Sequence, residues 1–136
     1  MNKVLSLGVL GEQIACDYLK SKRYSIIDRN FRKPWGEIDI IARDRDGTLV
    51  FVEVKTMVSS EFLKPEDNAT SAKLRKMKVA ASLYAGKYPG LVSDKAGWRI
   101  DLIAIPIPEE LAEQGTLTRQ DKDVLYKGLV HYENVG

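Results

Sequence analysis

The spacing of apolar residues predicts two helices and four strands before residue 106. Apolar residues recur every three or four positions over residues 7–22 and 71–87, which is typical of a helix with one buried face. Residues 24–31, 36–43, 48–56 and 98–105 are instead rich in isoleucine, valine and aromatic residues, which favour strands. The order α-β-β-β-α-β predicts an α/β fold in which helices pack against a mixed sheet.

Turn and capping residues predict where these elements end. Thr70 is a candidate N-cap for the second helix, Pro89-Gly90 ends that helix, and residues 57–69 form a loop before it. Pro106 ends the last of the four strands. Beyond it, Glu109–Gln114 is expected to form one or two helical turns and Val124–Tyr132 an edge strand.

The length of 136 residues predicts a single domain. We expect its core to cover about residues 7–106, with residues 107–136 as a C-terminal appendage.

The two strands 36–43 and 48–56 are expected to form a hairpin. Its turn is Arg45-Asp46-Gly47, with the glycine in the left-handed conformation. In this register Asp39 faces Glu53 and Glu37 faces Lys55, and all four side chains lie on one face. The other face is wholly apolar and contains Ile38, Ile40, Ala42, Val50, Val52 and Val54.

Two facing carboxylates repel each other unless a cation, a shared proton or a salt bridge compensates. Asp39 and Glu53 supply the hard oxygen donors that suit Mg²⁺ or Mn²⁺. The alternative is an ion-paired end of the sheet, in which Lys55 neutralises Glu53 or Glu37. Charge geometry alone leaves both interpretations open.

Residue counts exclude several other classes of site. Cys16 and His131 are the only residues of their types, so a disulfide within the chain and a multi-histidine metal site are excluded. No apolar run is long enough to span a bilayer and the N-terminus does not resemble a signal peptide, so we expect a cytoplasmic protein with no membrane partner.

The charge is unevenly distributed, although the formal net charge is only +2. Acids exceed bases after residue 106, so the positive excess lies before it. Acid-poor basic clusters attract polyanions such as nucleic acid, although they can equally be solvated helix faces. The two clusters are Lys20, Lys22, Arg23, Arg29, Arg32 and Lys33, and Lys73, Arg75, Lys76, Lys78 and Lys87.

Two motifs on consecutive strands carry a family resemblance. The segment from Gly36 to Ala42, followed by Phe51 to Thr56, resembles the PD-(D/E)xK nuclease superfamily, and within it the YraN family, which is related to archaeal Holliday-junction resolvases. The resemblance covers roughly residues 8–105. It departs from the pattern at Ile38, where the superfamily has proline, and at Met57, where the family has arginine. Further matching residues are Gly8, Gly11, Glu12, Ala15, Tyr18, Leu19, Asn30, Arg32, Lys73 and Arg99–Leu102.

The resemblance implies a restriction-endonuclease-like fold and a metal-dependent endonuclease acting on DNA, particularly branched or structured DNA. Asp39, Glu53 and the backbone carbonyl of Val54 would then bind Mg²⁺ or Mn²⁺. Glu12 would support that metal site, and Lys55 would activate the attacking water or stabilise the phosphate. The alternative is a nucleic-acid-binding module with this fold and little or no catalysis. Analogy with the resolvases, which cut two strands, implies a homodimer.

Other residues have two interpretations. Arg29, Arg32, Lys33, Lys73 and Lys76 are candidates for phosphate contacts or are solvated. Glu12 is a metal-site residue or a first-turn glutamate favoured by the helix dipole. Glu37 is a supporting acid or, with slight preference, the ion partner of Lys55. Arg99 and Asp101 are expected to form a structural ion pair, Cys16 to lie in the core and His131 on the surface. Trp35 is expected to pack in the core, with stacking on a base as the alternative.

Overall fold

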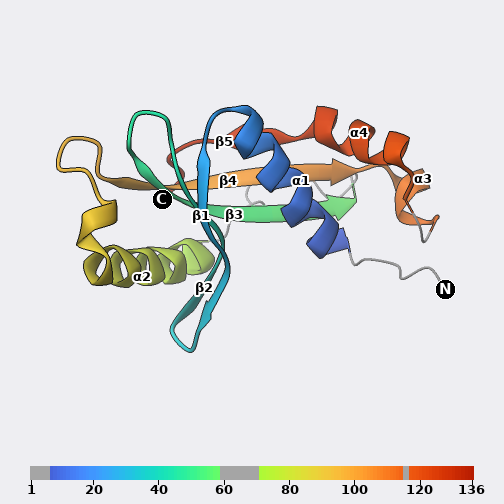
Figure 1. The fold of residues 1–136 in the computed structure, drawn as a ribbon. Helices are drawn as coiled ribbons and strands as arrows, with labels where there is room; N and C mark the ends of the chain where they lie inside the picture. The colour runs from blue at the N-terminus through green and yellow to red at the C-terminus, as the bar shows by residue number, and fades with distance from the viewer. Residues whose placement is uncertain (1–6, 59–70, 115–116) are drawn as a thin grey trace.

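The chain forms the helices and strands of a mixed α/β fold (Figure 1). The computed structural model describes residues 7–58, 71–114 and 117–136. Their elements are α1 (Leu7–Ser21), β1 (Ser25–Lys33), β2 (Gly36–Arg43), β3 (Leu49–Val58), α2 (Ser71–Lys87), the 3₁₀ helix η3 (Pro89–Leu91), β4 (Trp98–Ile107), α3 (Glu109–Ala112), α4 (Arg119–Gly128) and β5 (Val130–Tyr132).

The strands form one five-stranded sheet in the order β1-β2-β3-β4-β5. Among the described strands only β3 and β4 pair in parallel, and α2 lies between them in the chain. Helices α1 and α4 cover one face of the sheet and α2 covers the other (Figure 1). A mixed sheet flanked by helices is the architecture of the restriction-endonuclease-like fold, so the expected fold class is confirmed.

The sheet buries a separate apolar cluster under each helical layer. Alternation along β3 sends Val50 and Val52 to the α1 side, and Leu49 and Phe51 to the α2 side. Cys16 is buried in the first cluster, as expected. Strand β3 is therefore apolar on both faces near its start, as a central strand requires.

The hairpin turn has the predicted geometry. Gly47 has a φ of +93°, and the backbone N–H of Asp44 donates to the carbonyl of Thr48 over 2.9 Å. This turn sets the predicted register, which runs from Arg43 opposite Leu49 to Ile40 opposite Val52. Ile40 and Val52 are the last pair of this ladder among the described residues.

Beyond this pair β2 turns away from β3. The prediction that Asp39 and Glu53 are directly opposed is therefore wrong, and so is the pairing of Glu37 with Lys55. Ile38 belongs to the cluster under α2 rather than to the α1 side with Ile40. The hairpin of β1 and β2 follows this twist and extends beside α2 (Figure 1).

The C-terminal part of the chain differs most from expectation. Residues 124–128 are helical, because Thr118 and Asp121 form a capping box that starts α4, and Leu125 is buried in the core cluster under α1. Only Val130–Tyr132 forms the predicted edge strand, antiparallel to β4. Residues after 107 thus contribute both to the core and to the sheet.

Several boundaries also differ. Strand β3 continues through Met57 and Val58, and β4 continues through Pro106 to Ile107. Pro106 is tolerated because β5 pairs only with Leu102 to Ala104, so no strand of the described chain pairs with Pro106 on that edge of β4. Thr70 and residues 59–69 lie outside the described residues. None of the helices within the described ranges is long and apolar enough to cross a membrane.

Candidate functional site

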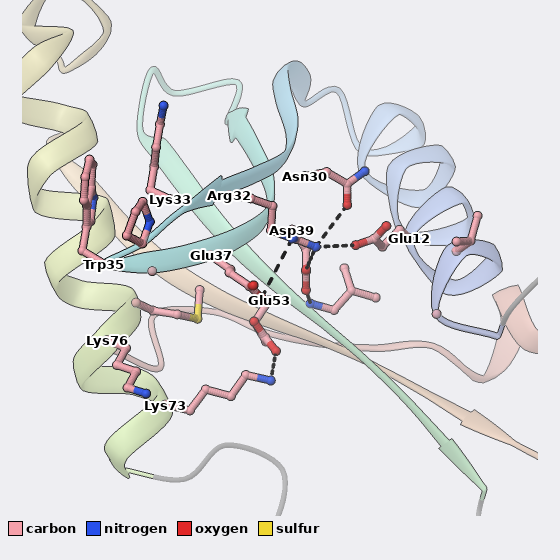
Figure 2. Close-up of a pocket in the computed structure, with 16 residues that line it drawn as sticks. Glu12, Asn30, Arg32, Lys33, Trp35, Glu37, Asp39, Glu53, Lys73 and Lys76 are labelled. Carbon is pink, nitrogen blue, oxygen red and sulfur yellow. Dashed lines mark hydrogen bonds and ion pairs between the residues drawn. The ribbon is translucent and has the colours of Figure 1, made fainter.

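A polar cavity of about 720 Å³ opens where β2 separates from β3. Four carboxylates line it (Figure 2): the largely exposed Glu37 at its rim, and the less exposed Glu12 from α1, Asp39 from β2 and Glu53 from β3. Glu53 points to the α2 side of the sheet, because its neighbours Val52 and Val54 pack on the α1 side. The separation of the strands therefore brings together acids from both faces of the sheet.

The side chain of Asp39 makes a hydrogen bond to β3 beyond the point where the β2–β3 pairing ends. Its Oδ2 accepts a hydrogen bond of 2.8 Å from the backbone N–H of Val54, two residues beyond the last paired residue of β3. The Asp39 carboxylate thus accepts the bond that a strand carbonyl would otherwise accept, and the partly buried N–H of Val54 stays satisfied. This bond fixes Asp39 beside Glu53.

Arg32 joins the carboxylates from above (Figure 2). Its Nη2 lies 3.4 Å from Oδ1 of Asp39 and 3.8 Å from Oε1 of Glu12, and its Nε lies 3.9 Å from Oε2 of the exposed Glu37. Asn30, which has a φ of 54°, accepts a bond of 3.2 Å from the same guanidinium. One arginine therefore partly neutralises three acids.

Lys73 neutralises Glu53, the carboxylate of the cavity that Arg32 does not pair with. Its Nζ forms an ion pair with Oε1 of the buried Glu53 (Figure 2). Lys73 lies in the first turn of α2, where the helix dipole disfavours a cation, so the attraction of Glu53 offsets that cost. The predicted phosphate contact of Lys73 stays a prediction.

Burial and mutual repulsion make two of the acids harder to ionise. Burial raises the pKa of Glu12, and the nearby Asp39 raises it further, while Arg32 opposes the change. Burial likewise raises the pKa of Glu53, with a further contribution from Asp39, against the effects of Lys73 and Arg32. Glu12 and Glu53 are therefore acids whose ionised forms are disfavoured by burial and by the neighbouring Asp39, and such perturbed groups are common at functional sites.

A divalent cation suits this donor set in its chemistry. The donors are carboxylate oxygens, the ligands that Mg²⁺ and Mn²⁺ prefer, and added positive charge would favour ionised Glu12 and Glu53. Arg32 and Lys73 would compete with such an ion, because both already contact these carboxylates. Within residues 7–58, 71–114 and 117–136, no three His, Cys, Asp or Glu side chains are gathered in an arrangement that could hold a metal ion.

The remaining predicted site residues occupy different places. Val54, Lys33 and Lys76 line the carboxylate cavity. Arg29 lies outside it and donates a 3.4 Å hydrogen bond to Gln13. Lys55 is half-buried on β3 and is not among the described residues that line the cavity. By alternation it lies on the same side of β3 as Glu53.

Sequence reasoning missed two features of the site. It gave Arg32 a phosphate contact but not its central position among the acids, and it gave Asn30 no role. Both residues are part of the family resemblance, and an asparagine within a strand is a recognisable sign of a left-handed residue. Trp35, expected in the core, is 48% exposed beside the cavity.

Close packing of α1 on β3 positions Glu12. Gly11 lies against the side chain of Thr56, and a Cβ at this position would collide with the Thr56 Cγ2 methyl group. Only glycine allows this approach, and the next residue along the helix is Glu12. The packing at Gly11 thus sets the distance between the first carboxylate and the other two.

Gly11→Ala should lower the free energy of unfolding by about 1–3 kcal/mol, the usual cost of overpacking. Gly8→Ala is the matched control on the same helix, because its Cβ would meet nothing within 4 Å. We expect that control to leave stability unchanged or to raise it by up to about 1 kcal/mol. Urea denaturation measures both, and equal stability of the two variants would contradict the close approach.

A second polar cluster lies on β4, away from the cavity. Asp101 is fully buried and accepts hydrogen bonds from Arg99 Nε (2.9 Å), His131 Nε2 (2.7 Å) and the backbone N–H of Asn134 (2.9 Å). The predicted Arg99–Asp101 ion pair is confirmed. The surface position predicted for His131 is wrong, because its side chain is only 8% exposed and also hydrogen-bonds Tyr18. This cluster attaches β5 to the sheet.

Comparison with known proteins agrees with the resemblance seen in the motifs. Residues 11–105 match the family described as "Uncharacterised protein family UPF0102". A UPF0102 protein of Geobacter sulfurreducens is 46% identical over 106 residues, which is 78% of each chain. One of Thermodesulfovibrio yellowstonii is 44% identical over 101 residues, covering 74% of this chain and 86% of the relative. One of Geotalea daltonii is 40% identical over 121 residues, covering 89% and 92%. The chain therefore belongs to the UPF0102 family, the family of the YraN proteins.

Proposed function

We propose that this protein is a metal-dependent endonuclease that hydrolyses phosphodiester bonds in DNA, with branched or structured DNA as the expected substrate. The observation that carries the proposal is the convergence of Glu12, Asp39 and Glu53 in one cavity. Carboxylates from three separate elements meet there although their charges repel, and the raised pKa values of Glu12 and Glu53 are the cost of that arrangement. Such a cost is expected where the acids serve a function.

Asp39, Glu53 and Glu12 would hold Mg²⁺ or Mn²⁺, with the carbonyl of Val54 as a further donor. When bound, the ion would lower the pKa of a coordinated water and neutralise charge on the phosphate. The hydrogen bond from the Val54 N–H keeps Asp39 oriented towards the cavity. Lys33 and Lys76 line the same cavity and supply positive charge that attracts a phosphate backbone.

Arg32 and Lys73 have a double role in this proposal. Each forms an ion pair with a carboxylate of the cavity. In the absence of a metal ion, these ion pairs stabilise the folded arrangement of the acids. Both cations also line the cavity, and their side chains are about half exposed (43% and 56%). If the carboxylates held a divalent cation, these two side chains would be placed to contact a phosphate.

The experiment that tests the proposal is a cleavage panel with single-stranded, duplex, flap and four-way DNA. Each substrate is incubated with the protein in Mg²⁺, in Mn²⁺ and in excess chelator. We expect strand cleavage that requires the divalent ion and is greatest on flap or four-way DNA. The proposal would be contradicted if none of the four substrates were cleaved in Mg²⁺ or in Mn²⁺.

Lys55→Met should lower any metal-dependent cleavage by on the order of 10²-fold or more, the usual contribution of a positioned proton-transfer group. Metal affinity should persist, because a charged ammonium has no lone pair to donate to the ion. Calorimetry with Mn²⁺ and a gel-based cleavage assay measure the two effects separately. Lys127→Met, an exposed lysine on α4, is the matched control. Wild-type cleavage by Lys55→Met would make Lys55 structural.

The second candidate function is a nucleic-acid-binding module with little catalysis. The ion pairs of Lys73 with Glu53 and of Arg32 with Asp39 favour it, because the acids already have counter-charges. In that case DNA binding should be as strong in chelator as in Mn²⁺. Asp39→Asn would then leave DNA affinity unchanged.

A further inference from the structure

A second cavity of about 540 Å³ adjoins the carboxylate cavity. It lies between β1 and the second half of α2, and its volume is in the range of ligand pockets. The two cavities share four lining residues, Asn30, Arg32, Lys33 and Trp35. A ligand long enough to fill this groove would therefore extend into the cavity that holds Glu12, Asp39 and Glu53.

Aromatic side chains are prominent in this groove. Trp35 is 48% exposed and Tyr88 is 41% exposed, although both are large apolar side chains. The rings of Phe31, Tyr84 and Tyr88 follow one another, with centroid distances of 5.3 Å and 4.8 Å. Tyr84 is buried, so the exposed ring surfaces of the groove are those of Trp35 and Tyr88.

The position of Trp35 is fixed by the neighbouring glycine. A Cβ on Gly36 would lie 2.8 Å from the Cβ of Ala80 and 3.2 Å from the carbonyl oxygen of Lys76. The tip of the hairpin therefore rests directly on α2, and Trp35 stands beside that helix (Figure 2). A ring held on a packed turn loses little entropy when a ligand stacks on it.

The charge of the groove complements a polyanion. Of the described residues that line it, four are basic and only Asp28 is acidic. The Nζ of Lys33 lies 5.7 Å from the Phe31 ring, and the Nζ of Lys87 lies 5.6 Å from the Tyr88 ring. Positive charges thus alternate with aromatic rings, the combination by which proteins bind single-stranded nucleic acid.

We propose that this groove binds unpaired nucleotides of a single strand and leads that strand to the carboxylate cavity. Bases stack on Trp35 and Tyr88, and Lys33 and Lys87 contact the phosphates. A duplex does not fit this chemistry, because its base faces are already stacked on one another. The inference rests on the proposed function, because it identifies the part of the substrate that is single-stranded. Binding in the groove itself needs no catalysis.

Tryptophan fluorescence tests the groove directly. Trp98→Phe leaves Trp35 as the only tryptophan, and Trp35→Phe leaves only Trp98, which packs against Phe51. Each variant is titrated in chelator with oligo-dT, with oligo-rU and with a duplex of equal length. We expect the single strands to quench the fluorescence of Trp98→Phe but not that of Trp35→Phe, and the duplex to quench neither. The dT and rU arms show whether the groove prefers DNA or RNA.

Affinity provides the second measurement. Trp35→Ala should weaken binding of oligo-dT by on the order of 10- to 100-fold, the effect of removing one stacking platform. Lys87→Glu should weaken it as well, whereas Lys122→Glu, an exposed lysine of α4 with the same charge change, should not. The lysine pair keeps the test valid if Trp35→Ala does not fold.

The outcomes separate this inference from the proposed function. Three results would each overturn the proposal that the groove binds a single strand. The first is Trp35 fluorescence that neither single strand quenches, and the second is equal quenching by the duplex. The third is equal affinity of Lys87→Glu and Lys122→Glu for oligo-dT. The protein could instead cleave no DNA while single strands still quench Trp35 fluorescence and Trp35→Ala still weakens binding. That result would support single-strand binding in the groove and contradict only the endonuclease proposal.

Discussion

Replacing Asp39 with asparagine should lower the rate of Mn²⁺-dependent DNA cleavage by on the order of 10²–10³-fold, the range expected when a charge-stabilising group is lost from a catalytic site. Asp39 is the carboxylate that adjoins both Glu12 and Glu53, so its charge is central to any cation held in the cavity. Asparagine keeps an oxygen that accepts the hydrogen bond from the Val54 N–H, and the strands should therefore keep their arrangement. Calorimetry should show Mn²⁺ binding to the wild type and much weaker binding to the variant.

The matched control for this experiment is Asp123→Asn on α4. It removes the same charge from an exposed position outside the cavity, so metal affinity and cleavage should be unchanged. Circular dichroism should show that both variants fold. Equal Mn²⁺ affinity of Asp39→Asn and the wild type would refute the assignment of Asp39 as a ligand.

Asp101→Ala should cause the largest loss of stability, about 3–5 kcal/mol, because it removes the buried ion partner of Arg99 and leaves the buried donors of His131 and Asn134 without their acceptor. Asp101 is fully buried and binds Arg99, His131 and the backbone of Asn134. Asp101→Asn keeps an acceptor and should lose less. Asp94→Ala, at an exposed position, should change stability by no more than about 0.5 kcal/mol. Urea denaturation distinguishes the three, and a loss as small as that of Asp94→Ala would show that the cluster is not stabilising.

The same aspartate should make stability depend on acid pH. Burial alone would raise the pKa of Asp101, but the hydrogen bonds from His131, Arg99 and Asn134 outweigh it and hold the pKa below its ordinary value. Its contribution is therefore present above about pH 3.9, the ordinary aspartate pKa, and is lost as the pH falls through the lowered value. Asp101→Asn should flatten this part of the stability curve, as unfolding measured between neutral and acid pH will show.

Local sequence signals predicted most of the fold. Gly47 and the residues around it fixed the hairpin register as far as Ile40 and Val52, because the turn type determines which residues face each other. The edge strand predicted from residue 124 was wrong as far as residue 128, because those residues are helical. The prediction followed the β-branched and aromatic residues of the segment and overlooked the capping box of Thr118 and Asp121. That box is a local signal and was available in the sequence.

The candidate site was less predictable than the fold. Strand alternation placed Asp39 and Glu53 together on one regular face, but they meet because β2 leaves β3 after Ile40. That separation depends on the packing of the hairpin against α2 at Gly36, which no local pattern specifies. The pairing of Lys73 with Glu53 likewise depends on where α2 lies on the sheet. Glu12 was placed correctly beside the apolar stripe of its helix.

The sheet order also implies a sequence of events during folding. Strands β1, β2 and β3 are joined by tight connections, whereas Leu49 of β3 pairs with Trp98, about fifty residues later in the chain. Pairs that close short loops form early, and the parallel pair has to wait for a large loop to close. Arg32 and Asp39 therefore meet in the early hairpin, whereas Lys73 joins Glu53 only once α2 has docked. During folding, Glu53 therefore gains its counter-charge later than Asp39 does.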